Sequence, residues 1–295
     1  MQWSPSLSLV ILRGRDGALS LPAGHRRKVL FLAATVLLLV LSAPGTISAG
    51  SATWSGSPGS GNWNVAGNWV PTTVPNSSAD TATFGTSNTT GVFLSADTEV
   101  NRIHFNPGAS GYTLSTGFVL TISGAGIANN SGTTQNFVLG AAPASSMDFG
   151  GTIQLMGSAT VGGATVFTLS GGTSNLGLGG AIGFLGSSSA GSGTFVSNGG
   201  AVANALGSAV AFAENSTAGN GTFTTHASAA SGASSGFVGF SSNASAGNAT
   251  FTNNAATVSN VEGGTTILSD NSTASNATFI NNGSVCASTG GKPAT

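Results

Sequence analysis

The most constraining feature of this sequence is a period of 28 residues in its last third. Two series of apolar residues recur at this spacing, and each member of one series stands 11 positions ahead of its partner in the other. Four copies in register, without a gap, indicate a repeat protein in this part of the chain. The two series are Phe195, Phe223, Phe251 and Phe279, and Phe184, Phe212, Phe240 and Leu268.

Each copy also carries the signal of a short β-strand. In Thr250–Thr252 and Thr278–Ile280 a Phe stands between β-branched residues, so a pleated strand would point the Phe to one face and its neighbours to the other. Lys, Arg and Gln are absent between Phe184 and Ile280, and Gly and Ser interrupt every helical run. Copies stacked at the spacing of a β-ladder, about 4.8 Å, would place Phe on Phe inside the stack. The prediction is an all-β fold, a parallel β-helix (β-solenoid) with 28-residue repeats in the C-terminal half.

Disorder is the competing interpretation of this composition. Only 5% of the residues are charged, against about 25% in ordinary globular proteins. A low-complexity chain of Gly, Ser, Thr, Asn and Ala can remain disordered. The 16 Phe residues, many of them periodic, favour the solenoid, because stacked apolar columns offset the entropy lost on ordering.

Residues 1–49 have the order of a secretory signal peptide. A basic cluster precedes the apolar run Val29–Leu41, and small residues follow it. The run is 13 residues long, whereas a membrane-spanning helix needs about 20. The sequence therefore predicts export to the cell surface or medium, with cleavage near Ala49 or Ala52. An uncleaved anchor and a twin-arginine signal at Arg26-Arg27 are the alternatives.

Loss of this segment would leave few charges. Arg102 and Lys292 would be the only basic residues against seven acidic ones, a net charge of −5 with histidine neutral. Two cations form no basic patch, which argues against nucleic acid as a partner. Cys286 is the only cysteine, so no disulfide can form within the chain.

Residues 50–91 contain all the tryptophans that follow the leader: Trp54, Trp63 and Trp69. One interpretation is an aromatic platform on which sugar rings stack. The other is a cap, since a bare end of a solenoid would expose strand edges and the apolar column, and terminal repeats are usually atypical. We expect an N-terminal Trp-rich cap over residues 50–91.

Residues 92–183 read as irregular β-helix coils. Val100, Arg102 and His104 alternate with Ile103 and Phe105, which predicts two faces of one strand. Further short apolar stretches follow, separated by Gly and Asn at short intervals. Several short strands with tight corners are expected here, before the regular repeats of residues 184–295.

The Trp-rich opening and the segment Val100–Phe137 resemble the start of bacterial autotransporter-type passenger proteins. The motifs STAGNGTF (Ser216–Phe223) and SAGNATFTNN (Ser245–Asn254) are similar to the autotransporter-associated β-strand repeats of the same surface proteins. The resemblance is one of pattern and composition, and it implies a right-handed parallel β-helix on, or shed from, a Gram-negative cell. It supplies no catalytic residues. No barrel-forming strands follow Lys292, which implies an outer-membrane secretion component outside this chain, or a fragment of a longer protein.

Carboxylates are the first candidates for catalysis, because polysaccharide lyases and glycosidases need two or three of them in one groove. Asp97 and Glu99 lie two residues apart and could share a strand face, and Asp80 is 17 residues earlier. Glu214 and Asp270 hold the same repeat position two copies apart, with Ser and Gly in the other copies. Such variation favours exposed, solvated carboxylates over a catalytic pair, so no catalytic residue is assigned.

Metal and cofactor sites are not expected either. His104 and His226 are the only histidines after the leader, and neither has partners at ligand spacing. His226 stands in a column otherwise held by Asn, which indicates a turn position. The glycine-rich segment Gly171–Gly180 lacks the aspartates of calcium-binding repeats and the Lys of a phosphate loop, so we expect corners there.

The regular Asn and Thr columns have a structural interpretation and a functional one. Asn tolerates left-handed corners and can form ladders of amides between coils. The rows Thr222–Thr224 and Thr250–Thr252 could instead order water, as ice-binding solenoids do, although the outer row is broken at Val196 and Ile280.

The sequence as a whole predicts an exported, non-enzymatic β-helix that acts as an adhesin, stalk or matrix protein. A carbohydrate-active enzyme and a water- or ice-ordering solenoid are the alternatives. The expected partners are a carbohydrate or another cell-surface ligand, and a second copy bound through the C-terminal coil, which lacks an evident cap.

Overall fold

The computed structural model describes residues 50–142, 150–257 and 261–283. These residues form β-strands, turns and loops, with one short 3₁₀ turn, η1 (Ala66–Asn68), and no α-helix among them. No helix in these ranges is long and apolar enough to cross a bilayer. The predicted leader 1–49, Asp148, Cys286 and Lys292 lie outside the described residues.

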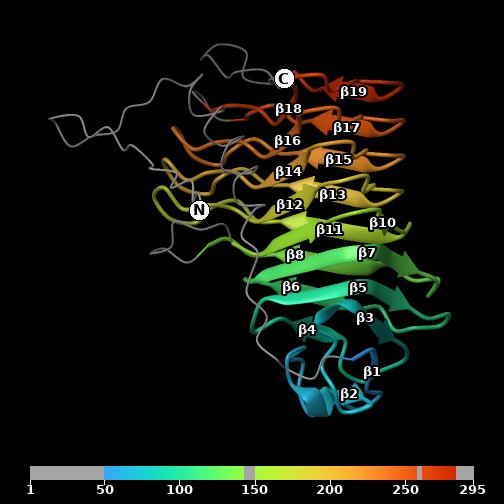
Figure 1. The fold of residues 1–295 in the computed structure, drawn as a ribbon. Helices are drawn as coiled ribbons and strands as arrows, with labels where there is room; N and C mark the ends of the chain where they lie inside the picture. The colour runs from blue at the N-terminus through green and yellow to red at the C-terminus, as the bar shows by residue number, and fades with distance from the viewer. Residues whose placement is uncertain (1–49, 143–149, 258–260, 284–295) are drawn as a thin grey trace, which may run out of the picture. The chain divides into compact units, whose positions relative to one another are not determined.

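All of the strands in the described residues belong to two sheets (Figure 1). Sheet A comprises β1 (Ala52–Trp54), β2 (Trp69–Val70), β3 (Ser77–Phe84), β5 (Thr98–Phe105), β7 (Val119–Asn129), β9 (Thr152–Leu155), β10 (Thr160–Val161), β12 (Ala181–Phe184), β14 (Ala209–Phe212), β16 (Phe237–Phe240) and β18 (Thr265–Leu268). Sheet B comprises β4 (Gly91–Phe93), β6 (Thr113–Thr116), β8 (Gln135–Leu139), β11 (Thr165–Leu169), β13 (Thr194–Ser197), β15 (Thr222–Thr225), β17 (Thr250–Asn253) and β19 (Thr278–Asn281).

From β3 onwards the chain alternates between the sheets, except that β9 and β10 both belong to sheet A, so each strand pairs with one from the next turn of the chain. The spatial order is β18-β16-β14-β12-β9-β7-β5-β3-β1-β2 in sheet A and β19-β17-β15-β13-β11-β8-β6-β4 in sheet B. Neighbours pair in parallel, as between β15 and β17, and only β1 and β2 are antiparallel. An all-β fold with parallel strands in stacked sheets is therefore confirmed, and it is consistent with the expected solenoid.

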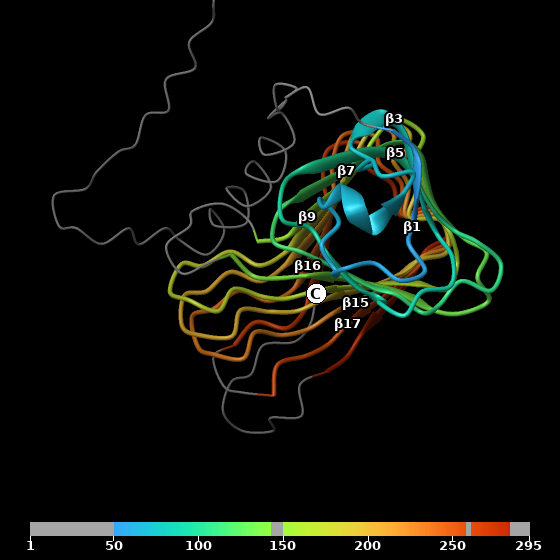
Figure 2. The ribbon, with the colours of Figure 1, turned by 90° about the horizontal axis from the view of Figure 1, so that it is seen from below.

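A third side of the stack is built from single-residue bridges. Thr160, Ser189, Thr217, Ser245 and Thr273 pair in parallel, each with the next. Single bridges arise because each of these residues lies between tight turns. The Ser189 hydroxyl, for example, accepts a 3.0 Å hydrogen bond from the Gly191 amide. Seen along the stack, the turns superimpose around a common interior, and loops between sheets B and A protrude to one side (Figure 2).

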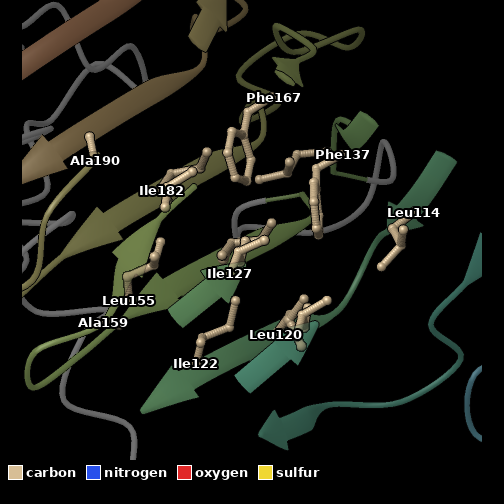
Figure 3. Close-up of a cluster of buried hydrophobic side chains, with 14 of the residues drawn as sticks. Leu114, Leu120, Ile122, Ile127, Phe137, Leu155, Ala159, Phe167, Ile182 and Ala190 are labelled. Atoms are coloured by element: carbon tan, nitrogen blue, oxygen red, sulfur yellow. The ribbon is translucent and has the colours of Figure 1, made fainter. Parts of the chain in front are cut away.

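The core consists mainly of two columns of stacked Phe rings. In sheet B, Phe137, Phe167, Phe195, Phe223, Phe251 and Phe279 follow one another with ring centroids 4.7–5.0 Å apart. In sheet A, Phe184, Phe212 and Phe240 stack at 4.5 and 4.6 Å. The predicted stacking of Phe on Phe is confirmed, and the sheet B column begins earlier than the four clear repeats. Towards the N-terminus aliphatic residues share the interior, as around Phe137 and Phe167 (Figure 3).

The first turn is closed by tryptophan. The indoles of Trp54, Trp63 and Trp69 are all at most 2% exposed and pack edge to face, with centroids 5.1 Å apart for Trp54 and Trp69 and 4.9 Å for Trp63 and Trp69. All three rings contact Phe84, from which the aromatic core continues to Phe105. The tryptophans therefore belong to the apolar core, as a cap requires, and their faces form no platform for sugars.

The last described turn is more exposed than those before it. Phe279 in β19 is 37% exposed, whereas Phe251 at the same position one strand earlier is 0% exposed. Ile280 is 44% exposed.

The side-chain directions in β5 differ from the alternation expected from the sequence. Val100 is fully buried, whereas Arg102 and His104 point outward and are partly exposed. The register shifts between Val100 and Arg102, because β3 and β7 each place three residues opposite the single residue Asn101. The side chains of β5 that follow are in the opposite phase. The expectation that Val100 shares a face with Arg102 is therefore wrong.

Candidate functional site

Two of the three N-terminal carboxylates, those of Asp80 and Asp97, accept hydrogen bonds from backbone amides. Asp97 precedes β5, and its Oδ1 accepts a 2.9 Å hydrogen bond from the Val119 amide. Glu99 lies within β5, beside Thr121 of β7. Asp80 in β3 is 6% exposed and accepts a 3.0 Å hydrogen bond from the Asn76 amide. Asp80 and Asp97 thus each fix the chain where it enters a strand.

Glu214 and Asp270 occupy one column of corners, directly after the strands of sheet A. Both have a positive φ, 59° and 55°, and so do Gly186 and Ser242 in the same column, at 67° and 56°. The Glu214 carboxylate accepts a 2.6 Å hydrogen bond from the Gly186 amide, and Asp270 accepts one of 3.0 Å from the Ser242 amide. Each carboxylate therefore reaches back to the corner one turn earlier, which gives it a structural role at an exposed site.

The residues of this column indicate the corners in the sequence itself. Gly157 and Gly186 precede Glu214 in the column, and glycine is the residue that adopts a positive φ at the lowest cost. A column that contains Gly, Ser and acidic residues is typical of a left-handed corner rather than of a solvated surface position alone.

The two histidines lie on different parts of the stack. Nε2 of His104 lies 3.1 Å from Nδ2 of Asn130 on the outer side of β5. Partial burial and the nearby Arg102 guanidinium lower the pKa of His104, burial being the larger cause. His226 lies beside Asn254, whose Nδ2 is 3.2 Å from the imidazole Nδ1. Within the described ranges no three His, Cys, Asp or Glu side chains come together as metal ligands.

Amide ladders are the most extensive polar feature, as the structural interpretation of the Asn columns expected. On one corner Asn276 donates to Asn248, and Asn248 to Asn220, both at 3.2 Å. At the end of β17, Asn253 is 1% exposed, donates to Asn281 at 2.8 Å and accepts from the Thr225 hydroxyl at 2.7 Å. These bonds connect consecutive turns, so the columns stabilise the stack.

The column that contains His226 follows the same rule with one substitution. Asn282 donates to Asn254 at 2.8 Å, and Asn254 contacts His226 at the position an Asn would hold. Because the Asn254 amide nitrogen can only donate, the His226 Nδ1 is the acceptor in this contact. His226 thus continues an amide ladder.

The outer face of sheet B is an ordered array of β-branched residues. From β11 to β19 its two columns contain only Val, Thr and Ile, and no charged side chain lies among them. The first column is Val166, Thr194, Thr222, Thr250 and Thr278, and the second is Thr168, Val196, Thr224, Thr252 and Ile280. The breaks noted at Val196 and Ile280 preserve the β-branched shape and remove the hydroxyl.

The glycine-rich segment Gly171–Gly180 forms the first of the regular protruding loops. The loop closes at its base, where the Gly180 amide donates to the Ser170 carbonyl at 2.8 Å. The next loop stacks on it, with the Ala201 amide bound to the Gly172 carbonyl and the Leu206 amide to the Gly177 carbonyl, both at 2.9 Å. These close backbone contacts explain the glycines, since a side chain at Gly171 or Gly172 would meet a neighbouring backbone carbonyl.

Comparison with known proteins adds no further guide to function. The chain matches no known protein family, no curated protein and no solved structure.

Proposed function

We propose that this chain is an exported, non-enzymatic surface protein that acts as a stalk, adhesin or matrix component of a bacterial cell. In this proposal it is a parallel β-helix with a 28-residue coil, related to the passenger domains of autotransporters. Signal-directed export through residues 1–49 delivers it, and an outer-membrane component outside this chain completes secretion.

The observation that carries the proposal is that the polar side chains form hydrogen bonds within the scaffold. Asp80, Asp97, Glu214 and Asp270 accept hydrogen bonds from backbone amides, and Asn columns bind their own copies in the next turn. Side chains committed to the scaffold favour a rigid support over a reaction centre. Continuous Phe columns act in the same direction, because each turn is stabilised by its neighbours on both sides.

Export is tested with an epitope tag inserted between Ser231 and Gly232, which are exposed at the tip of a protruding loop. In a Gram-negative host we expect protease added to intact cells to remove the tag, or the tag to be recovered from the medium. Leu38→Arg with Leu39→Arg interrupts the apolar run of the leader and should retain the protein in the cytoplasm. Cytoplasmic retention of the parent would contradict export.

The non-enzymatic role is tested with the acidic pair nearest the N-terminal turns. Asp97→Asn with Glu99→Gln should leave any carbohydrate binding nearly unchanged, because neither change removes a side chain from the core. The purified parent is incubated with a panel of neutral and acidic polysaccharides, and new reducing ends and unsaturated products are measured. Lyase or hydrolase activity in the parent that the double variant loses would overturn the proposal.

The array on sheet B favours a second candidate, an ordered-water or ice-binding surface. Rigid β-branched side chains in two straight columns, uncharged and evenly spaced, would hold methyl and hydroxyl groups in a fixed lattice. Thermal hysteresis and ice recrystallisation are measured for the parent, for Thr224→Lys and for Thr217→Lys on the third side. Activity lost in the first variant alone supports this candidate, and an inactive parent excludes it.

A further inference from the structure

The described part of the chain has one arginine, and it points outward together with a histidine just after the register shift between β5 and its two neighbours. Arg102 and His104 lie two residues apart on the outer face of β5. Val100, two residues before Arg102 on the same strand, is instead fully buried. Irregularities of strand pairing redirect side chains and are over-represented next to functional sites.

Two hydroxyls extend this pair on the neighbouring strand. Thr81 of β3 pairs in register with Arg102, and Thr83 pairs with His104, so the four side chains occupy adjacent positions on one outer surface. The spacings of a sheet set the size of this group, about 4.8 Å between strands and about 6.6 Å along each strand. β3 and β5 lie side by side near the N-terminal end of the stack (Figure 1).

The strand on the other side leaves this group open. Gly126 of β7 pairs with Arg102, and Ala128 pairs with His104. Glycine is required at position 126, where φ is 93° and an added Cβ would meet the backbone of Thr160. Because Gly126 and Ala128 have little or no side chain, β7 does not cover the side chains of Arg102 and His104 from this side.

The group offers several hydrogen-bond donors to a ligand. Arg102 presents its guanidinium N–H donors from the partly exposed outer face of β5. At His104 the Asn130 amide nitrogen donates to Nε2, which places the proton of the neutral ring on Nδ1. A cation, an imidazole N–H and two hydroxyls on one open surface match the acceptors of an oxyanion.

We propose that Arg102, His104, Thr81 and Thr83 form a binding site for an oxyanion group, such as the carboxylate of an acidic sugar, a sulfate ester or a phosphate. Arg102 binds the anion through two parallel hydrogen bonds, His104 Nδ1 donates a third, and the threonine hydroxyls fix its orientation. The site gives a protein of negative net charge a single point of attachment to an acidic polymer. It does not depend on the surface-protein role, since an oxyanion would bind here in any setting.

The test is an NMR titration of the histidines in the full chain, with galacturonate, sulfate and phosphate in separate arms at constant ionic strength. Bound anion favours the imidazolium form, so the pKa of His104 should rise as the ligand saturates. His226, on another part of the stack, is the internal control and should not respond. Gln variants of His25, His104 and His226 assign the three resonances.

Arg102→Gln should weaken binding about tenfold or more, because it removes a charge-assisted bidentate contact. In the free protein the same change should raise the pKa of His104, since Arg102 lowers it in the parent. Thr121→Val, on the outer face of β7 before its own bend, is the matched control and should bind as the parent does.

The arms also identify the source of the anion. A response to galacturonate alone assigns acidic sugars, and a response to sulfate or phosphate assigns the corresponding ester. Equal responses at His104 and His226, or a response that Arg102→Gln leaves unchanged, would overturn the site, while the export and polysaccharide tests above would stand unaffected.

Discussion

The ring of Phe240 meets the ring of Phe251 edge to face, with centroids 5.7 Å apart and ring planes at 82°. The same contact joins Phe212 to Phe223 and Phe184 to Phe195, so the two Phe columns are linked in each turn. Stacking along the columns and edge contacts between them bury each ring on several sides, and aromatic pairs in such geometry contribute about 0.5–1.5 kcal/mol beyond their buried area.

Phe251→Asp places a carboxylate in the centre of this arrangement. Loss of the ring alone costs about 3–5 kcal/mol, and a buried charge without a partner adds to that cost. We expect limited proteolysis to cut the variant around β17, since each turn depends on its neighbours. Thr252→Asp, one residue on and directed outward, is the control and should resist protease as the parent does. Equal resistance of both variants would show that Phe251 is not a core residue.

The Phe columns could be predicted because sequence period and strand alternation both mark them. Phe195, Phe223, Phe251 and Phe279 keep one spacing, and each stands between residues that must face the other way. The burial of the three tryptophans was also predictable, because large apolar residues before the first regular turn need to leave water. In each case the apolar side chain itself determines the outcome.

The corners and the third side could not be predicted in the same way. Ser189, Thr217 and Ser245 pair as single residues between turns, so they leave no alternation to detect. The carboxylate of Glu214 binds a backbone amide 28 residues earlier, and that amide becomes available only after two turns have stacked. The change of phase in β5 after Asn101 depends likewise on the strands beside it, since β3 and β7 each carry extra residues opposite Asn101.

Two substitutions in the corner column should change the stability of the protein in opposite directions. Gly186→Ala adds a Cβ at a φ of 67° and at 2.9 Å from the Gly157 carbonyl oxygen, which should cost about 1–2 kcal/mol. Ser242→Gly relieves a non-glycine residue of a φ of 56° and should stabilise the protein by up to about 1 kcal/mol. Urea denaturation of both variants measures the two signs, and a shared sign would contradict the left-handed corner.

Two asparagines of the ladders should differ in their contribution to stability. Asn253 is 1% exposed and bonds Thr225, Thr266 and Asn281. Asn253→Ala leaves the buried Thr225 hydroxyl without its partner and should cost about 2–3 kcal/mol. Asn248 is exposed, and Asn248→Ala should change stability by about 0.5 kcal/mol or less. Denaturation midpoints compare the two, and equal losses would show that burial does not set the strength of the ladder.

Stability should depend on pH through His104. Its pKa in the folded protein lies below the ordinary value of 6.5, so the unfolded chain takes up a proton first as the pH falls. The stabilisation is present above about pH 6.5 and is lost as the pH falls through the lower folded pKa. His104→Gln should flatten this part of the profile of unfolding free energy against pH. An unchanged profile would assign the dependence to other groups.

The final prediction concerns the exposed coil that contains β19. Its neighbour β17 lies on one side, and no described strand pairs with the other edge, while Phe279 and Ile280 stay 37% and 44% exposed. An antiparallel pairing of β19 with its own copy about a two-fold axis would satisfy both edges and bring the two Phe279 rings together. We therefore expect light scattering to show a fraction of dimer that increases with protein concentration.

Phe279→Lys, or a charged capping coil added after Gly283, should keep the protein monomeric. Val196→Lys, in the outer column of Ile280 but in the middle of the stack, should dimerise like the parent. A parent that stays monomeric at the highest concentration reached would show that this coil is already covered.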